Sequence, residues 1–578
     1  MQNMNEDKEI QLMLKRSQDL MSQRKEILSL SPEKALNAIL DSPQPTPLVH
    51  SFPEQDFYCL IHDIGITDSL PVLSLASDRQ WEHILDMEVC ERDRIDTGMV
   101  SRWLDLLFKV DPNRFVRWFF EQQTGFVEYY LSKHIEVKIR EHDQSPSDFG
   151  NDFFTLDETF YVRIIDYSFD QEPDPGAKKI NEEFLPEFLE CLAGHDLAKY
   201  QQILLESQTV ISAEYEEEAY RLRNVRLAEK GFLPFEEAVG IYQPPSPTDI
   251  QSRPPEYFEQ SAGTRPLVPV PLYPVQLLET GNLFVEALKK ITREDILQQI
   301  QTEFAGLSNQ IIVADRKKIK HRKELTKVVK KACGYIAIGL EVLPGEDGKT
   351  DADRSAALIR KFPLSEIFRT GYGIGLKLKW RAEKWRKKSW VEHRNLPLNF
   401  WGEEWLGVLG GLLIKKPLFY DNYKTGVLYR EFRSMDDVKK TESVLNEIIA
   451  FDNLLSLMAP EFEPVPDVLL THKNLVLTLW ARHCLGMPEA LLPVPLEDFR
   501  RFYADLWSGK DIPRKTRRSM KESFLNWLSE KTALQPEEIT QSLGQTLETL
   551  FAEIENEYGV VSTRDLDPRF ISLFLIKN

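Results

Sequence analysis

The segments SDRQWEHILDMEV (Ser77–Val89) and VSRWLDLLFKVDPNRFVRWF (Val100–Phe119) decide the expected fold of this chain. Ser77, followed three residues later by Gln80, predicts a capping box, and Asp111 before Pro112 predicts another helix start. Apolar residues recur at intervals of three and four, at Trp81, Ile84, Leu85 and Val89 and again at Val100, Trp103, Leu104, Leu107 and Phe108. Each helix therefore has one apolar stripe, and short helices of this kind stack as antiparallel pairs.

The rest of the chain predicts a mainly α-helical protein. A chain of 578 residues is too long to form a single hydrophobic core, and its hydrophobic content of 42% is sufficient for packed interiors. We expect two multi-helical domains, repeat-like or irregular bundles, with a minor β element near 153–166, where TLDETFYVRII is rich in β-branched and aromatic residues. The expected organisation is an N-terminal helix at 1–30, a helical domain at 31–242, a proline-rich connector at 243–275 and a second, mainly helical domain with basic stretches at 276–578.

Proline density marks the expected breaks in regular structure. Nine prolines fall between 243 and 274, at 244, 245, 247, 254, 255, 266, 269, 271 and 274. Neither a regular helix nor a central strand tolerates that density, so an extended connector is expected there. The same reasoning predicts an extended loop at Ser42–Pro53, which contains four prolines.

Charge and cysteine usage predict a soluble cytoplasmic protein. The formal net charge of −19 argues against nonspecific nucleic-acid or membrane binding by the chain as a whole. The N-terminus MQNMNEDKEI is polar and acidic, unlike a signal peptide, and no apolar window reaches the ~20 residues of a membrane span. Five scattered cysteines without a C-x-x-C pair are typical of reduced thiols.

Four segments resemble a family of uncharacterised bacterial proteins, the domain of unknown function 6178. They are LSPEKALNAIL (Leu30–Leu40), LASDRQWEHILDMEVCERDRID (Leu75–Asp96), RLAEKGFLPFEEAVGIY (Arg226–Tyr242) and FRSMDDVKKT (Phe432–Thr441). The similarity covers about residues 25–560. Because these segments are helix, cap and turn patterns, the resemblance implies a long, mainly helical bacterial protein and brings no reaction and no site residue.

The segment LIHDIGIT (Leu60–Thr67) resembles the metal-binding core of the HD phosphohydrolases. In that family an adjacent His and Asp ligate a divalent metal that activates water against a phosphoester, which makes His62 and Asp63 candidate metal ligands. A complete site also needs an upstream His and a downstream Asp, and the upstream His available is His50 in the proline-rich loop. The alternative is a plain helix end, with Gly65 as the C-cap and His62 or Asp63 exposed.

Glycine spacing suggests two further features. Gly371, Gly373 and Gly375 look like a phosphate-binding loop, but the preceding PLSEIFRT favours a helix rather than a strand, so a flexible turn between helices is expected. Gly407 and Gly411 in WLGVLGGLLI are expected to let two helices approach closely.

Three basic stretches, at 316–331, 377–394 and 514–518, are candidates for binding a polyanion. The second interleaves three tryptophans, Trp380, Trp385 and Trp390, with seven cations, Lys377, Lys379, Arg381, Lys384, Arg386, Lys387 and Lys388. Cations and stacking aromatics together are typical of single-strand nucleic-acid binding. The alternative is that some tryptophans belong to the core while the cations are solvated or pair with acidic parts of the chain.

No catalytic constellation stands out, since serines, histidines and acids are too numerous to nominate a triad. His472 and His483 lie on one apolar helical segment and are expected to be satisfied polar residues rather than ligands. The leading hypothesis is a noncatalytic helical interaction or scaffold protein with another protein as partner and no cofactor. The alternatives are a metal-dependent phosphohydrolase at His62 and Asp63, and polyanion (nucleic acid) binding through residues 377–394.

Overall fold

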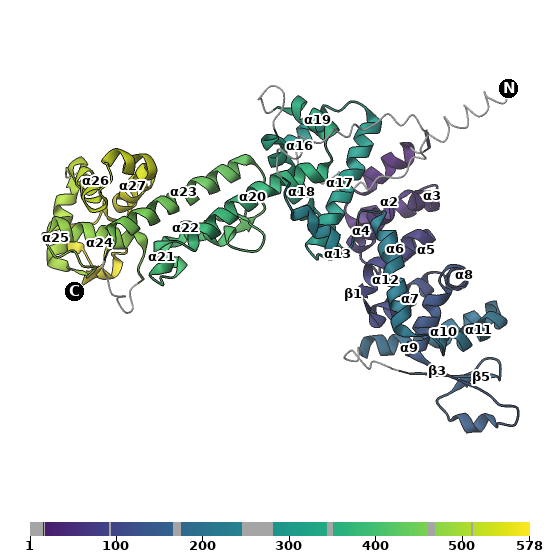
Figure 1. The fold of residues 1–578 in the computed structure, drawn as a ribbon. Helices are drawn as coiled ribbons and strands as arrows, with labels where there is room; N and C mark the ends of the chain where they lie inside the picture. Colours follow the sequence, from purple (N-terminus) through teal and green to yellow (C-terminus); the bar gives the residue numbers. More distant parts are fainter. Residues whose placement is uncertain are drawn as a thin grey trace, which may run out of the picture. The chain divides into compact units, whose positions relative to one another are not determined.

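The computed structural model describes residues 15–16, 18–91, 94–165, 175–245, 281–343, 351–460, 469–509 and 512–577. They form two compact units (Figure 1). Unit 1 holds the described parts of Met1–Gln243, Thr248–Cys333 and Gly345–Phe368, and unit 2 holds those of Pro244–Pro247, Gly334–Pro344 and Arg369–Asn578. Most of the expected connector at 243–275 and residues 1–14 of the expected N-terminal helix lie outside the described residues, so the expected domain boundaries remain predictions.

Unit 1 begins as a run of short helices that pack on one another. They are α2 (Pro32–Leu40), α3 (Pro45–Ser51), α4 (Glu54–Ile64), α5 (Leu70–Ser74), α6 (Asp78–Glu88), α7 (Thr97–Val110), α8 (Pro112–Gln122), α9 (Thr124–His134), α10 (Pro175–His195), α11 (Leu197–Ser207) and α12 (Ser212–Ala228). Helix α4 packs on α2 and α6, α7 packs on α5, α8 and α10, and α9 packs on α8 and α11. The side chains of Trp81, Trp103 and Phe115 are fully buried in this core. The short amphipathic helices and the caps at Ser77 and Asp111 are confirmed.

A small antiparallel sheet follows α9. Its strands are β3 (Ile135–Ile139), β4 (Phe154–Thr155) and β5 (Phe160–Ile164), in the order β3-β5-β4, with the 3-10 helix η1 (Pro146–Phe149) between β3 and β4. Ile135 pairs with Ile164, and Val137 with Val162. Strands β1 (Cys90–Glu91) and β2 (Arg94–Ile95) form a separate hairpin. The expected β element near 153–166 is confirmed, and β3 is an additional strand that was not predicted, although its residues IEVKI alternate between apolar and charged.

The remaining elements of unit 1 come from both sides of residues 246–280. They are α13 (Phe235–Ala238), η2 (Val239–Tyr242), α16 (Leu283–Lys289), α17 (Glu294–Ala314), the first half of α18 (Arg322–Val342), α19 (Ala352–Lys361) and the start of α20 (Leu364–Arg386). Helix α17 packs on α13 and η2, and α16 packs on α19.

Unit 2 is built around two helices that lie side by side, α22 (Gly402–Leu412) and α23 (Met435–Met458) (Figure 1). Its other helices are the rest of α18 and α20, α21 (Trp390–His393), η3 (Leu398–Trp401), α24 (His472–Cys484), α25 (Leu496–Leu506), α26 (Arg518–Thr532), α27 (Pro536–Tyr558), η4 (Thr563–Asp565) and η5 (Pro568–Phe570). Two-residue strands pair as β6 (Phe419–Tyr420) with β7 (Tyr429–Arg430), β8 (Val494–Pro495) with β11 (Ile576–Lys577), and β9 (Trp507–Ser508) with β10 (Lys515–Thr516). The mainly α fold is confirmed.

The expected extended loop at Ser42–Pro53 is wrong, because α3 lies within it. Pro45 and Pro47 occupy the first turn of α3, where backbone N–H groups have no partner inside the helix. A proline there loses no hydrogen bond, and its fixed φ suits the helix start. The number of prolines therefore does not decide whether this segment is helical, whereas their position in the first turn of the helix does.

The expected turn at Gly371–Gly375 is also wrong, since all three glycines lie in the middle of α20. A Cβ atom at Gly371 would lie 1.9 Å from the carbonyl oxygen of Tyr335 in α18. The glycine thus allows two helix backbones to touch, and this packing outweighs the ~1 kcal/mol by which glycine disfavours a helix.

Among the described helices, none combines the length and the apolar character that crossing a lipid bilayer requires.

Candidate functional site

Unit 2 contains a cleft of about 690 Å³ whose walls come from α22, α23 and α27, the loop after β6 and the first residues of α24. Small-molecule and cofactor pockets of proteins commonly span ~300–1,000 Å³. The cleft combines an aromatic floor with a rim of charged side chains, and we take it as the candidate functional site.

Aromatic side chains around His472 form the floor. The imidazole stacks on Trp405 with ring centroids 4.6 Å apart and an interplanar angle of 11°. Phe451 meets the same imidazole edge-on at 5.2 Å, and Trp401 lies 5.7 Å away. His472 itself is 3% exposed although it lines the cleft. These neighbours leave the ring little freedom to rotate.

The protonation state of His472 follows from its surroundings. Burial lowers the pKa of His472 to about 3, so the ring is neutral near pH 7. Its Nδ1 lies 3.3 Å from the carbonyl oxygen of Phe400, which can only accept, so Nδ1 carries the proton and donates it. The remaining ring nitrogen, Nε2, is then a hydrogen-bond acceptor.

Charged side chains of both signs surround this floor. The described lining residues include three lysines and five glutamates, Lys424, Lys440, Lys473, Glu403, Glu404, Glu447, Glu553 and Glu557. Lys473 donates to both carboxylate oxygens of Glu553 at 2.6 Å. Thr546 donates to Oε2 of Glu447 at 2.8 Å, which fixes that carboxylate within the wall.

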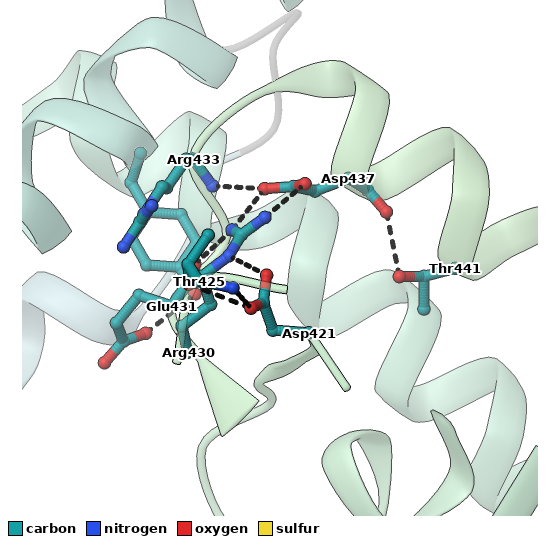
Figure 2. Close-up of polar contacts among 8 residues, drawn as sticks. Asp421, Thr425, Arg430, Glu431, Arg433, Asp437 and Thr441 are labelled. Atoms are coloured by element: carbon teal, nitrogen blue, oxygen red, sulfur yellow. Dashed lines mark hydrogen bonds and ion pairs between the residues drawn. The ribbon is translucent and has the colours of Figure 1, made fainter. Parts of the chain in front are cut away.

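One wall of the cleft is held by a partly buried arginine, Arg430, between two aspartates, shown in Figure 2. Nε of Arg430 donates to Asp421 at 2.7 Å, and its two terminal nitrogens donate to the carboxylate of Asp437 at 2.7 and 2.8 Å. The Asp421 and Asp437 side chains are 2% and 7% exposed. Bidentate contacts of this kind fix position as well as charge. The β6–β7 hairpin is therefore fastened to the first turn of α23.

Backbone and hydroxyl donors complete this cluster. The amide of Thr425 donates to Asp421 Oδ2 at 2.6 Å and its hydroxyl does so at 2.8 Å, while the amide of Arg433 donates to Asp437 Oδ2 at 2.9 Å. Burial favours the protonated form of Asp421, but the hydrogen bonds from Arg430 and Thr425 outweigh it and lower the pKa of this carboxyl. The end of β6 and the loop after it, which bring Tyr420, Asn422 and Lys424 to the cleft, are thus held in place.

The glycines of α22 seat the same hairpin. A Cβ atom at Gly407 would lie 2.3 Å from the ring of Tyr420, and one at Gly411 would lie 2.5 Å from the carbonyl oxygen of Leu418. These glycines do allow a close approach, but the expectation of a second helix is wrong. The neighbouring segment is β6 and the residue before it.

His62 and Asp63, the candidate metal ligands, lie near the end of α4 in unit 1 and have separate partners. His62 is buried, and its Nε2 lies 3.1 Å from Oε1 of Glu88. Asp63 accepts a hydrogen bond from the backbone amide of Arg322 at 3.2 Å. In the part of the chain that the structure describes, no group of three or more His, Cys, Asp or Glu residues could hold a metal ion. The metal site stays an untested prediction, and Gly65 caps the helix with a φ of +107°.

Glu88 is the centre of a buried polar cluster in unit 1 that the sequence did not indicate. Tyr58 donates to Oε1 at 2.6 Å and Lys320 donates to Oε2 at 2.7 Å. Burial opposes ionisation of Glu88, but the contacts with His62, Lys320 and Tyr58 outweigh it and lower its pKa to about 2. One lysine of the 316–331 stretch therefore neutralises an acid of the first half of the chain.

The candidate polyanion residues at 377–388 lie on α20 and the turn after it. Three of them have acidic partners, Lys379 with Glu383, Arg381 with Glu442, and Arg386 with Glu392. The other four, Lys377, Lys384, Lys387 and Lys388, are exposed and have no ion pair among the described residues. Trp380 is 50% exposed, whereas Trp385 and Trp390 are buried. The structure thus separates one solvent-facing tryptophan from two that belong to the core.

The third basic stretch contributes to packing. Arg514 lies over the rings of Trp507 and Tyr503 and donates to the carbonyl of Gly559 at 3.2 Å. Lys515 pairs with Glu555 at 2.9 Å.

The residues of the cleft come from segments that are far apart in sequence. The sequence placed His472 and His483 on one apolar helical segment. Of the two, His472 lines the cleft, whereas Nδ1 of His483 lies 3.1 Å from the carboxylate of Glu489. The spacing of Trp401 and Trp405, four residues apart, did not enter the predictions from sequence and is a local signal that could have pointed to the floor. Asp437 falls within FRSMDDVKKT, where no pattern distinguishes it from its neighbour Asp436.

Comparison with known protein families adds one finding. The sequence model described as "Family of unknown function (DUF6178)" matches residues 14–577. The chain belongs to this family. The resemblance noted from the four sequence segments is therefore confirmed, and the match includes every residue of the cleft. Neither the curated proteins nor the solved structures contain a match.

Proposed function

We propose that this member of the DUF6178 family is a noncatalytic interaction protein whose second unit receives a polypeptide segment in the cleft. One observation carries the proposal: a cleft of about 690 Å³ has buried aromatic rings at its floor and charges of both signs at its rim. Aromatic anchors provide binding energy at low entropic cost, and a polar rim provides selectivity. A segment of extended chain carries side chains of both kinds.

The wall formed by the β6–β7 hairpin supports the proposal. Arg430 fixes the hairpin through the buried carboxylates of Asp421 and Asp437, and the loop between the strands is exposed. A binding site needs supporting contacts that hold its surface in place before the ligand arrives.

A cleft-filling substitution tests this function. A random-sequence peptide library is selected against the full chain, and the recovered peptides are measured by fluorescence polarisation against Thr549→Trp. Thr549 lies on α27, is exposed and lines the cleft. We expect its replacement to weaken binding at least about tenfold, because the indole occupies the ligand's volume.

Ala552→Trp is the matched control. Ala552 is exposed on the same helix but is not a lining residue, so the same substitution leaves the cleft open. We expect wild-type affinity for this variant. Peptides that bind Thr549→Trp as tightly as the wild type, or a selection that recovers no peptide, would refute the proposed function.

A second candidate function, polyanion binding through α20, is favoured by the exposure of Trp380. Lys377, Trp380 and Lys384 are spaced by three and four residues, so they share one face of the helix. A half-exposed tryptophan between unpaired lysines offers both a stacking surface and positive charge.

Retention on single-stranded DNA and on heparin tests this candidate. We expect retention that falls steeply with salt, and that is lost in Lys377→Gln/Lys384→Gln/Lys388→Gln. Trp380→Ala should weaken binding to DNA more than binding to heparin, because heparin has no bases to stack. The control is Lys318→Gln/Lys323→Gln/Lys327→Gln, which removes three exposed lysines from another basic stretch. Equal retention of the two triple variants would refute a site on α20.

A further inference from the structure

The acidic and basic side chains that line the cleft differ in number and in whether a ligand can pair with them. Five glutamates against three lysines leave an excess of two negative charges among the described lining residues. Lys473 is neutralised because it contacts both oxygens of Glu553. The other two lysines, Lys424 and Lys440, are exposed, and so are three of the glutamates, Glu403, Glu404 and Glu557, so solvent screens these charges of both signs alike. Among the described lining residues, Glu447 is then the charged group that is neither exposed nor paired with an opposite charge.

Two hydrogen-bond acceptors of the lining, Glu447 and His472, are less exposed than these lysines. Glu447 is half-buried and accepts hydrogen bonds from two hydroxyls, Thr546 at 2.8 Å and Ser443 at 3.4 Å, but has no cation within ion-pair distance among the described residues. Because the pKa of His472 is about 3, this ring offers the lone pair of Nε2 and no positive charge. Trp405 and Tyr420 add aromatic rings to the same lining.

Glu447, His472 and the aromatic rings all favour the same kind of ligand group. A carboxylate, a neutral imidazole acceptor and aromatic rings all attract a cation that carries N–H donors. An acidic ligand would meet the negative charge of Glu447 and would leave Nε2 of His472 without a donor. A buried acceptor left without a donor disfavours such a complex.

We propose that the cleft selects a basic side chain, the guanidinium of arginine or the ammonium of lysine, in the segment that it receives. The inference rests on the proposed function and names its ligand class. The cation lies near Glu447 and Nε2 of His472, and the aliphatic part of the side chain packs on the aromatic floor.

Labelled pentapeptides Gly-Ala-X-Ala-Gly, with X as arginine, citrulline or glutamate, test the selection on the full chain by fluorescence polarisation. Citrulline has the shape of arginine without its charge. We expect the arginine peptide to bind at least about tenfold more tightly than the citrulline peptide, which is the usual worth of one charge-assisted hydrogen bond. N-acetyl-arginine amide is added as a competitor, to probe the side chain apart from the peptide.

Glu447→Gln keeps the acceptor for Thr546 and removes the charge, so it should reduce the preference for arginine over citrulline about tenfold. His472→Phe, which keeps the stacked ring but removes Nε2, is the second variant and should act in the same direction. Glu497→Gln is the control, because Glu497 lies on α25 outside the cleft with an 81% exposed side chain.

The outcomes separate the two proposals. Equal binding of the arginine and citrulline peptides, both weakened by Thr549→Trp, would overturn the basic-side-chain inference and leave the peptide-binding function standing. Tighter binding of the glutamate peptide would do the same. If no peptide binds but N-acetyl-arginine amide does, the cation selection stands and the polypeptide partner is wrong. If nothing binds, both fall.

Discussion

Arg430 is the side chain on which the wall of the cleft depends. Arg430→Met keeps most of the volume but leaves the buried carboxylates of Asp421 and Asp437 without their cation. We expect a loss of about 3–5 kcal/mol in the free energy of unfolding, measured by urea denaturation. Arg500→Met is the comparison, because Arg500 pairs with a Glu497 side chain that is 81% exposed, and its loss should cost about 1 kcal/mol or less. Similar losses for the two variants would contradict the role assigned to Arg430.

His472 makes the stability of unit 2 sensitive to acid. Burial lowers its pKa to about 3 from an ordinary value of 6.5. Because the unfolded chain binds this proton more readily, the contribution of His472 is complete above pH 6.5 and is lost as the pH falls toward 3. We expect wild-type protein to lose about 3 kcal/mol more than His472→Phe between pH 7 and pH 4, measured as free energies of unfolding. Parallel pH profiles of the two proteins would contradict this burial.

Individual side chains of the site were only partly predictable from the sequence. His472 was visible as a histidine in an apolar segment, but its role depends on Trp405 and Phe451, which lie elsewhere in the chain. His62 and Asp63 formed a recognisable pair, and the structure gives each a different partner. A motif fixes which residues are adjacent in sequence, whereas partners are chosen by packing.

Among the secondary-structure elements, α20 carries a close helix contact at Gly371. Gly371→Ala would bring a Cβ atom to 1.9 Å from the Tyr335 carbonyl oxygen, so the two helix backbones must move apart. We expect a loss of at least about 1–3 kcal/mol, observed as a lower midpoint of thermal unfolding.

Gly306→Ala is the matched helical control. Gly306 lies within α17, and a Cβ atom there would meet no heavy atom within 4 Å. We expect this variant to gain about 0.5–1 kcal/mol, because alanine favours the helix over the unfolded chain. If Gly371→Ala were equally stabilising, the contact between α18 and α20 would be refuted.

Helices with their own local signals were predictable, and elements defined by distant partners were not. Ser77 and Gln80 predict the start of α6 by the pattern of a capping box, and the structure contains that capping box. Strand β3 was missed although apolar and charged residues alternate over Ile135–Ile139, because so short a run becomes a strand through its pairing with β5. The glycines of α20 look like a turn until the backbone of α18 is present beside them.

Across the whole molecule, the connector predicted at 243–275 is accessible to a direct test. Both of its basic residues, Arg253 and Arg265, precede a proline, so trypsin cannot cut there, whereas Tyr257 and Phe258 are chymotrypsin sites. If the prolines exclude regular structure, limited chymotrypsin treatment should cut first at these two residues while trypsin spares the segment. Mass spectrometry of the early fragments gives the answer. First cuts elsewhere would show that the predicted boundary is wrong.

The fold class of the molecule was predictable from the sequence, but the position and lining of the cleft were not. Apolar periodicity identifies helices one at a time, and the mainly α architecture follows from adding them. The cleft requires α22, α23, α24 and α27 together, which start at residues 402, 435, 472 and 536. No local sequence pattern specifies how these four helices pack together.

The clamp formed by Asp421, Arg430 and Asp437 has a consequence for affinity. The loop between β6 and β7 is exposed, and an unrestrained loop of that kind would surrender conformational freedom each time a ligand docked. Here the ion pairs at its two ends have already restricted that freedom during folding. Association can then proceed without first ordering the wall, so differences in affinity among ligands should reside mainly in how slowly they leave.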